Sequence, residues 1–176
     1  MIYNNNKNIK TLTMSAFALA LSVFSLLLFR GPISIASTFL IPVIIVLFSR
    51  GQLKSYLLVY AGLFTTTLLF FPTQIIFVAT YMLLSALLKV FFITSTFKVN
   101  ISLLGVIGYI LIVSLVLFVG IRLTELVFLV PLHTMMLRIS GNNFLSYSLI
   151  LVIEGIFVSI FNIGILRLFV PRIATS

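Results

Sequence analysis

The feature of this sequence that most limits its fold is a succession of long apolar runs with almost no charge inside them. A helix needs about 20 apolar residues to cross the hydrocarbon core of a bilayer, and the chain of 176 residues has room for about six. Only 7% of the residues are charged, whereas a soluble domain carries roughly 25%. We therefore expect an all-α membrane protein, a single integral membrane domain (1–176), with spans at about 12–29, 33–48, 53–71, 73–93, 101–121 and 144–170.

Two segments lie outside these predicted spans. Residues 1–10 form a polar tail, in which a run of three asparagines favours disorder. Residues 122–143 interrupt the apolar pattern with four ionisable side chains, a proline and a Gly-Asn-Asn turn, so we expect an outer loop there. The second span is short and contains Pro42, which favours a kink or a partly re-entrant course.

The placement of the basic residues predicts the orientation in the membrane. Cytoplasmic loops carry an excess of Lys and Arg. A cytoplasmic N-terminus places eight basic residues inside, namely Lys7, Lys10, Arg50, Lys54, Lys89, Lys98, Arg167 and Arg172. The outside receives three, namely Arg30, Arg122 and Arg138. Six spans then return the C-terminus to the cytoplasm, so we expect both termini on that side.

Composition also argues against several classes of function. The net charge of +9 comes from single or paired basic residues between apolar runs, a placement that serves topology and anionic lipid headgroups, so we expect no nucleic acid partner. The chain has no cysteine. We find no nucleophile–base set, no phosphate-binding glycine loop and no metal-ligand cluster, so we expect neither an enzyme nor a bound metal or cofactor.

Small residues recur in the first predicted span at helical spacing. Ala16 and Ala20 lie four residues apart, and Ser15, Ala18, Ser22 and Ser25 follow one another at steps of three and four. Such residues let a second helix approach closely in lipid. Two interpretations remain open: packing against the chain's own helices, or docking of a separate membrane subunit.

The predicted outer loop contains four ionisable residues, Arg122, Glu125, His133 and Arg138. Arg122 and Glu125 are three residues apart and can pair on a helix. In one interpretation the segment is an interfacial helix whose polar face meets headgroups. In the other, one arginine is available to bind a ligand carboxylate, with His133 as a hydrogen-bonding residue.

Glu154 is the single acidic residue inside a predicted span. A carboxyl group there is costly, so it is expected to face the bundle interior, either protonated or paired. Asn162 follows eight residues later, on roughly the same helical face. The pair is a candidate for ligand contact, and the alternative is a structural hydrogen bond between helices.

The chain resembles the substrate-binding S component of energy-coupling factor (ECF) transporters. The similarity lies in its length, its predicted spans and its short basic tail, and in the opening KTLTMSAFALA of residues 10–20. Members of that family commonly begin with a basic residue, a Leu-Thr pair and an Ala-x-x-x-Ala element, which here is Ala16 and Ala20. The resemblance implies that this element docks on a transmembrane coupling subunit, which works with two ATPase subunits.

The resemblance also implies that the chain binds a vitamin or similar nutrient near the outer face, using outer loops and the last helix. The residues expected there are Arg122, Glu125, His133, Arg138, Glu154 and Asn162. The abundance of Phe and the few polar residues in the spans favour a small, largely apolar nutrient with an anionic end, such as lipoate. The ligand site is expected at the outer ends of the fourth to sixth spans.

A second function remains open: a non-transporting scaffold similar to the small membrane subunit of the rod-shape cell-wall machinery. The run Thr65–Thr67 in the third span contains no acid, and together with the hydrophilic tail it argues mildly against this reading. Co-purification with ATPase subunits or with cell-wall synthesis proteins separates the two functions.

Overall fold

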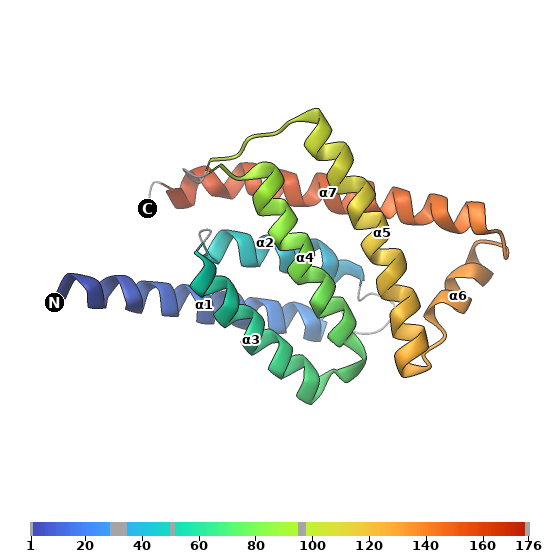
Figure 1. Ribbon diagram of the computed structural model, residues 1–176, viewed down its shortest axis with the longest axis horizontal. Coiled ribbons are helices and arrows are strands. Elements are labelled where there is room, and N and C mark those ends of the chain that lie inside the picture. Colours follow the sequence, from blue (N-terminus) through green and yellow to red (C-terminus); the bar gives the residue numbers. More distant parts are fainter. Residues whose placement is uncertain (1, 29–34, 50–51, 95–97, 175–176) are drawn as a thin grey trace.

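A computed structural model describes residues 2–28, 35–49, 52–94 and 98–174 of the chain, and these form helices without a β-strand. Figure 1 shows the arrangement, with both termini towards one side and α6 at the other. The elements are α1 (Ile2–Leu28), α2 (Ile35–Ser49), α3 (Leu53–Phe70), the 3₁₀ helix η2 (Pro72–Gln74), α4 (Ile75–Phe92), α5 (Leu103–Phe128), α6 (Leu132–Ile139) and α7 (Phe144–Ala174). Arg30 and Arg50, which the predicted orientation counts, lie outside the described residues.

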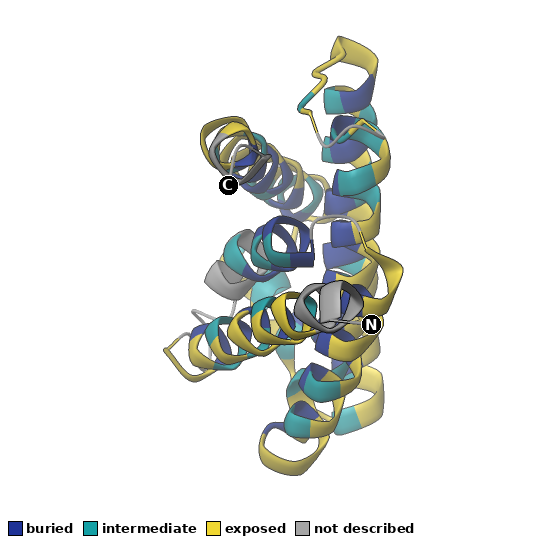
Figure 2. Ribbon diagram, turned by 90° about the vertical axis from the view of Figure 1, so that its left-hand side faces the viewer, coloured by how far each residue is buried: buried dark blue, intermediate teal, exposed yellow. Residues whose placement is uncertain are grey.

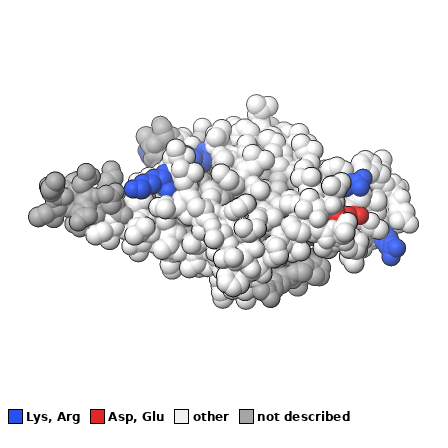
Figure 3. All heavy atoms as spheres, turned by 60° about the horizontal axis from the view of Figure 1, so that its bottom comes forward, with Lys and Arg blue, Asp and Glu red and all other residues white. Residues whose placement is uncertain are grey.

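Five of the described helices, α1, α3, α4 (with η2), α5 and α7, are long and apolar enough to cross a membrane. Their outward faces carry large hydrophobic side chains, which Figure 2 shows as exposed residues along the helices. On the face drawn in Figure 3, the described charged residues gather near the two ends of the molecule, separated by an uncharged band. Such a band suits hydrocarbon, so the fold is consistent with the expected multi-pass membrane protein.

The short helix α2 forms the centre of the bundle. It packs against α1, α3, α4 and α7, and most of its described side chains are buried, including Ile41, Val43 and Ile45. Its 15 residues correspond to about 22 Å of helix, less than the ~30 Å hydrocarbon core. Pro42 lies inside the helix. The count of six spans therefore stays a prediction, with α2 as the span in question.

Helices α1 and α3 run side by side in the same direction, because α2 returns the chain between them. Two hydrogen bonds set their register. The Ser15 and Ser55 hydroxyls lie 2.6 Å apart, and the Thr11 hydroxyl donates to Oε1 of Gln52 at 3.1 Å. Within an apolar bundle such bonds hold one register, since a shift leaves buried hydroxyls without partners.

Helices α5 and α7 cross closely at Gly155. A Cβ at this position would collide with Oγ of Ser114 and would lie 3.1 Å from the Ile110 carbonyl oxygen. Further along the same pair of helices, Nδ2 of Asn162 donates to the Tyr109 hydroxyl at 3.1 Å. Glycine therefore allows the crossing, and the buried amide holds the two helices in one register.

Three described helices extend beyond the boundaries of the predicted spans. Residues 2–10 belong to α1, so the tail predicted to be disordered is helical. Helix α5 continues to Phe128, so Arg122 and Glu125 lie on a helix rather than in a loop. Helix α7 continues past the predicted boundary at residue 170 to Ala174, with Pro171 inside it. In each case tertiary context or continued helical hydrogen bonding overrides a local signal of polarity or proline.

Candidate functional site

Four rings from three helices meet at the end of the molecule that contains α6. We call Phe118 of α5, His133 of α6, and Phe144 and Tyr147 of α7 the aromatic cluster. Phe118, His133 and Tyr147 touch one another, with ring centroids 5.1–6.2 Å apart, and Phe144 lies 6.3 Å from Phe118 and from Tyr147. His133 and Tyr147 are buried, so the cluster fills the space between the three helices.

Turn chemistry places α6 over this cluster. Helix α5 ends at Phe128, and Leu129 directly after it adopts the left-handed conformation with φ 56°. Pro131 precedes α6, and Gly141 and Asn142 follow it with φ of 70° and 58°. Glycine and asparagine tolerate that region. The eight residues of α6 are therefore folded back between α5 and α7, with His133 directed inward.

His133 is the buried polar residue of the aromatic cluster. Its Nδ1 lies 3.3 Å from the Tyr147 hydroxyl, and which of the two donates depends on the imidazole tautomer. Burial lowers the pKa of His133, and the nearby Arg122 lowers it further against the opposing charge of Glu125. The imidazole is therefore neutral at pH 7, when it presents one donor and one acceptor.

Glu125 joins the end of α5 to α6. Its Oε2 accepts from the Thr134 backbone N–H at 3.0 Å, and its Oε1 accepts from the Thr134 hydroxyl at 2.7 Å. The carboxylate thus caps the first turn of α6, a position that favours negative charge. Both oxygens of Glu125 therefore have a partner within the protein, and its contact with a ligand stays a prediction.

Arg122 makes no ion pair within the described part of the chain, although its spacing allows one with Glu125. It is exposed, and its guanidinium carbon lies 6.0 Å from the centroid of the Phe118 ring. A guanidinium at this distance from an aromatic face gains a modest cation–π attraction. Arg138, at the end of α6, is also exposed and lies outside the aromatic cluster.

The two predicted site residues of α7 lie at different depths. Asn162 is fully buried and bonded to Tyr109, and it lies 15 residues beyond Tyr147, about 22 Å along a helix. It cannot share a small ligand with the aromatic cluster. Glu154 is only two turns from Tyr147, about 10 Å along the helix, and its buried Oε1 has no hydrogen-bond partner among the described residues.

The small residues of α1 divide into two faces. Ser15, Ala18, Ser22 and Ser25 are buried against the chain's own helices. Ala16 and Ala20 are exposed and lie beside the exposed rings of Phe17 and Phe24. The first set therefore packs the bundle. Ala16 and Ala20 lie on an exposed face, and docking of a separate subunit there stays a prediction.

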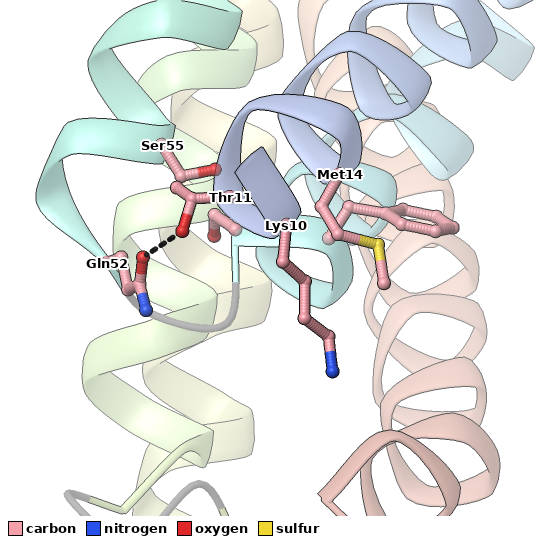
Figure 4. A pocket seen from close by; sticks show the side chains of 7 residues that line it. Lys10, Thr11, Met14, Gln52 and Ser55 are labelled. Atoms are coloured by element: carbon pink, nitrogen blue, oxygen red, sulfur yellow. Dashed lines mark hydrogen bonds between the residues drawn. The ribbon is translucent and has the colours of Figure 1, made fainter. Parts of the chain in front are cut away.

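Two hollows lie beside the contact between residues 9–14 of α1 and the start of α3, at the opposite end from α6. The smaller, about 130 Å³, is shown in Figure 4 and is lined by residues that include Lys10, Thr11, Gln52 and Ser55. The larger, about 270 Å³, shares Thr11 and adds Lys54. We call them together the α1–α3 groove. The sequence places both lysines at the predicted cytoplasmic rim, and the structure places one at each hollow.

A third hollow, about 320 Å³, lies on the other side of α3, against α4. The amine of Lys89 lies 5.5 Å from the centroid of the Tyr56 ring at this hollow.

Among the described residues no three of His, Asp and Glu come together as metal ligands. No protein-family model, curated protein or solved structure matches this chain.

Proposed function

We propose that this chain is the membrane-embedded substrate-capture subunit of an ECF-type importer in a bacterial cell membrane, with both termini cytoplasmic. It binds a small, largely apolar nutrient with an anionic end beside Arg122. The observation that carries the proposal is the arrangement of α5, α6 and α7, in which an arginine without an ion-pair partner among the described residues borders a cluster of aromatic side chains.

The different bonding of Glu125 and Arg122 supports this proposal. Because Thr134 satisfies both carboxylate oxygens of Glu125, the nearest acid does not neutralise Arg122. A guanidinium binds a carboxylate with two parallel hydrogen bonds. The rings of Phe118 and Phe144 border the same place and offer apolar surface. A molecule with an apolar body and one carboxylate matches both features.

The ligand enters by displacement of α6 in this proposal, because the aromatic cluster fills its own centre. Helix α6 is short and packs mainly through His133 and the partly buried Leu132, Met136 and Leu137. Its two ends are turns, so small rotations at Leu129 and Gly141 move it as a unit. Glu154, two turns below Tyr147, then has its unpartnered oxygen within the region that the ligand approaches.

A binding titration tests the anionic clamp. Lipoate and its neutral amide are titrated calorimetrically into the purified protein, into Arg122→Gln and into Arg138→Gln, the last as a matched control. A charge-assisted hydrogen bond is worth about 1.5–3 kcal/mol, so Arg122→Gln weakens lipoate binding roughly ten- to a hundredfold. The amide binds the natural protein as weakly as lipoate binds the variant. Unchanged lipoate affinity in Arg122→Gln excludes the clamp.

The exposed alanines of α1 provide a test of assembly. We expect a transmembrane coupling subunit to pack on Ala16 and Ala20, so Ala16→Trp/Ala20→Trp reduces recovery of coupling and ATPase subunits with the tagged protein. Ala61→Trp/Ala79→Trp, at exposed positions of α3 and α4, is the control and retains them. Recovery of cell-wall synthesis proteins in place of ATPase subunits would favour the scaffold function.

A further inference from the structure

The hollow of about 320 Å³ between α3 and α4, which we call the α3–α4 hollow, is bordered by one face of each helix. Its lining residues repeat at steps of three and four, which is the spacing of side chains on a single helical face. They are Leu53, Tyr56, Leu57 and Tyr60 of α3, and Met82, Ala86, Lys89 and Val90 of α4. Each helix therefore contributes one continuous wall to a single hollow.

The hollow exists because a small side chain lies between two longer ones. Ala86 is four residues from both Met82 and Val90, so the three share one face of α4, and all three are exposed. A methyl group between two longer side chains leaves space beside it. On the α3 side the rings of Tyr56 and Tyr60 are buried and stacked, with centroids 6.2 Å apart. The hollow is thus formed by side-chain size on a packed pair of helices.

Lys89 is the charged residue among those that line the hollow. Its amine lies 5.5 Å from the centroid of the Tyr56 ring, which places the ammonium group beside the wall that α3 contributes. The Tyr60 hydroxyl is bonded to Ser85 and to the Tyr81 carbonyl oxygen, so its polar group is satisfied within the protein. No lining residue is acidic. The hollow therefore presents one cation to an otherwise mainly apolar space, and its lining does not repel an anion.

The hollow extends from the end of two candidate spans into one leaflet. Leu53 begins α3, and Lys89 lies three residues before Phe92, the last residue of α4, where a long basic side chain reaches the headgroups. Tyr60 is seven residues beyond Leu53, about 10 Å along a helix. This length is less than half of the ~30 Å hydrocarbon core, which a partner's transmembrane helix would cross completely. The hollow therefore matches an acyl chain of one leaflet.

From this geometry we infer that the α3–α4 hollow binds one anionic phospholipid, with its phosphate at Lys89 and an acyl chain along Leu57, Ala86 and Met82. The acyl chain provides little selectivity, because it leaves one apolar environment for another. Selectivity comes from Lys89, which favours an anionic headgroup about fivefold over a zwitterionic one, since a zwitterionic headgroup carries its own cation. This inference is independent of the proposed transport function.

Photo-crosslinking in vesicles tests the site on the natural sequence. The purified protein is reconstituted into bilayers of phosphatidylcholine and phosphatidylglycerol, in which a small fraction of one of the two lipids carries a diazirine midway along an acyl chain. After illumination, mass spectrometry of the peptides measures labelling of residues 53–60 and 82–90. Labelling of residues 111–119, where Leu111 and Leu115 are exposed near the middle of α5, measures the contact that any lipid makes with the protein.

We expect the phosphatidylglycerol probe to label residues 53–60 and 82–90 about fivefold more than the phosphatidylcholine probe does at the same fraction. Residues 111–119 are labelled equally by both probes, because that segment has no charged side chain to select a headgroup. Equal labelling of the α3 and α4 segments by both probes overturns the inference. Labelling of these segments below that of residues 111–119 by both probes also overturns it, since acyl chains then do not enter the hollow.

Charge variants identify Lys89 as the source of that preference. Lys89→Gln abolishes the preference, and Lys89→Arg, which keeps the charge, retains it. Lys98→Gln removes a charge from an exposed position that does not line the hollow and also retains it. A preference that survives in Lys89→Gln overturns the proposed headgroup contact.

A bulky substitution tests the acyl-chain position separately. Ala86→Trp fills the hollow and lowers labelling of residues 53–60 by both probes. Leu115→Trp places the same ring at an exposed position of α5 and leaves that labelling unchanged. Labelling of residues 53–60 that is unaffected by Ala86→Trp overturns the site.

Discussion

The two ends of this molecule differ in how far their polar side chains are buried and bonded within the protein. At the α6 end, the aromatic cluster is closed: His133 and Tyr147 are buried against each other, and Glu125 is bonded twice to Thr134. At the other end, the α1–α3 groove is open, and Lys10 and Lys54 extend from it without ion pairs among the described residues. At the α6 end His133, Tyr147 and Glu125 are bonded within the protein and the two arginines are exposed, whereas at the other end the two lysines are exposed beside open hollows.

This difference has a consequence for binding. A ligand at the closed end must displace side chains before it gains contacts, so affinity there depends on how easily α6 moves. A ligand at the open end meets a preformed surface and competes with abundant neighbouring lipid. The closed end can therefore be selective for a rare molecule, while the open end suits a common component of the membrane.

The largest expected effect concerns which side of the membrane each end occupies. The chain has no cysteine, so single cysteines at Asn143 and Gln52, both exposed, report separately on the two ends. In intact cells a membrane-impermeant maleimide labels Asn143→Cys and leaves Gln52→Cys unlabelled until the cells are opened. The reverse pattern would place the groove outside and the aromatic cluster inside.

The second prediction compares packing at the two ends. Tyr147→Ala removes a fully buried ring that contacts Phe118, His133 and Phe144, and loss of a buried aromatic side chain costs about 3–5 kcal/mol. Leu58→Ala, at the half-exposed groove wall, costs less than about 1 kcal/mol, because little of its packing is enclosed. Equilibrium unfolding of the purified variants measures both values, and similar losses would mean that the ends are equally packed.

The third prediction concerns the link between α5 and α6. Glu125→Gln weakens both hydrogen bonds to Thr134, so α6 detaches more often and its backbone amides exchange hydrogen faster. Hydrogen exchange measured by mass spectrometry over residues 132–139 is expected to rise severalfold, while residues 53–70 exchange at the natural rate. Thr134→Val, which removes only the hydroxyl bond, gives an intermediate rise. Unaltered exchange over 132–139 would show that Glu125 does not hold α6.

The fourth prediction is a pH dependence confined to the closed end. Because burial lowers the pKa of His133, the unfolded chain takes up its proton at higher pH than the folded protein does. The stabilisation is complete above about pH 6.5 and is lost as the pH falls below that value, by at most about 1.4 kcal/mol per unit. Unfolding measured from about pH 7.5 to 5.5 shows this slope. His133→Asn reduces it, and an identical slope in that variant would assign it elsewhere.

The smallest expected effect is on the stability of the open end. Lys10→Gln/Lys54→Gln replaces two exposed side chains that have no ion-pair partner among the described residues, so its free energy of unfolding changes by less than about 0.5 kcal/mol. A large loss of stability would instead show that the lysines hold α1 and α3 together.

By itself, the sequence determined that the chain is helical and largely apolar, and it placed α3, α4 and the start of α7 within about two residues. These features depend on local composition, and an apolar run of about 20 residues has few alternatives in a bilayer. It also identified Arg122, Glu125 and His133 as neighbours in one unusual segment, because they are close in the chain.

Tertiary structure alone decided what those residues contact. Whether Glu125 pairs with Arg122 or with Thr134 depends on α6 folding back onto α5, and the spacing of charges carries no information about that turn. The small residues of α1 likewise divide into inner and outer faces only once α2 and α3 pack against one side. The α1–α3 groove arises from residues about 40 positions apart, which become neighbours because α2 returns the chain to the same end of the bundle.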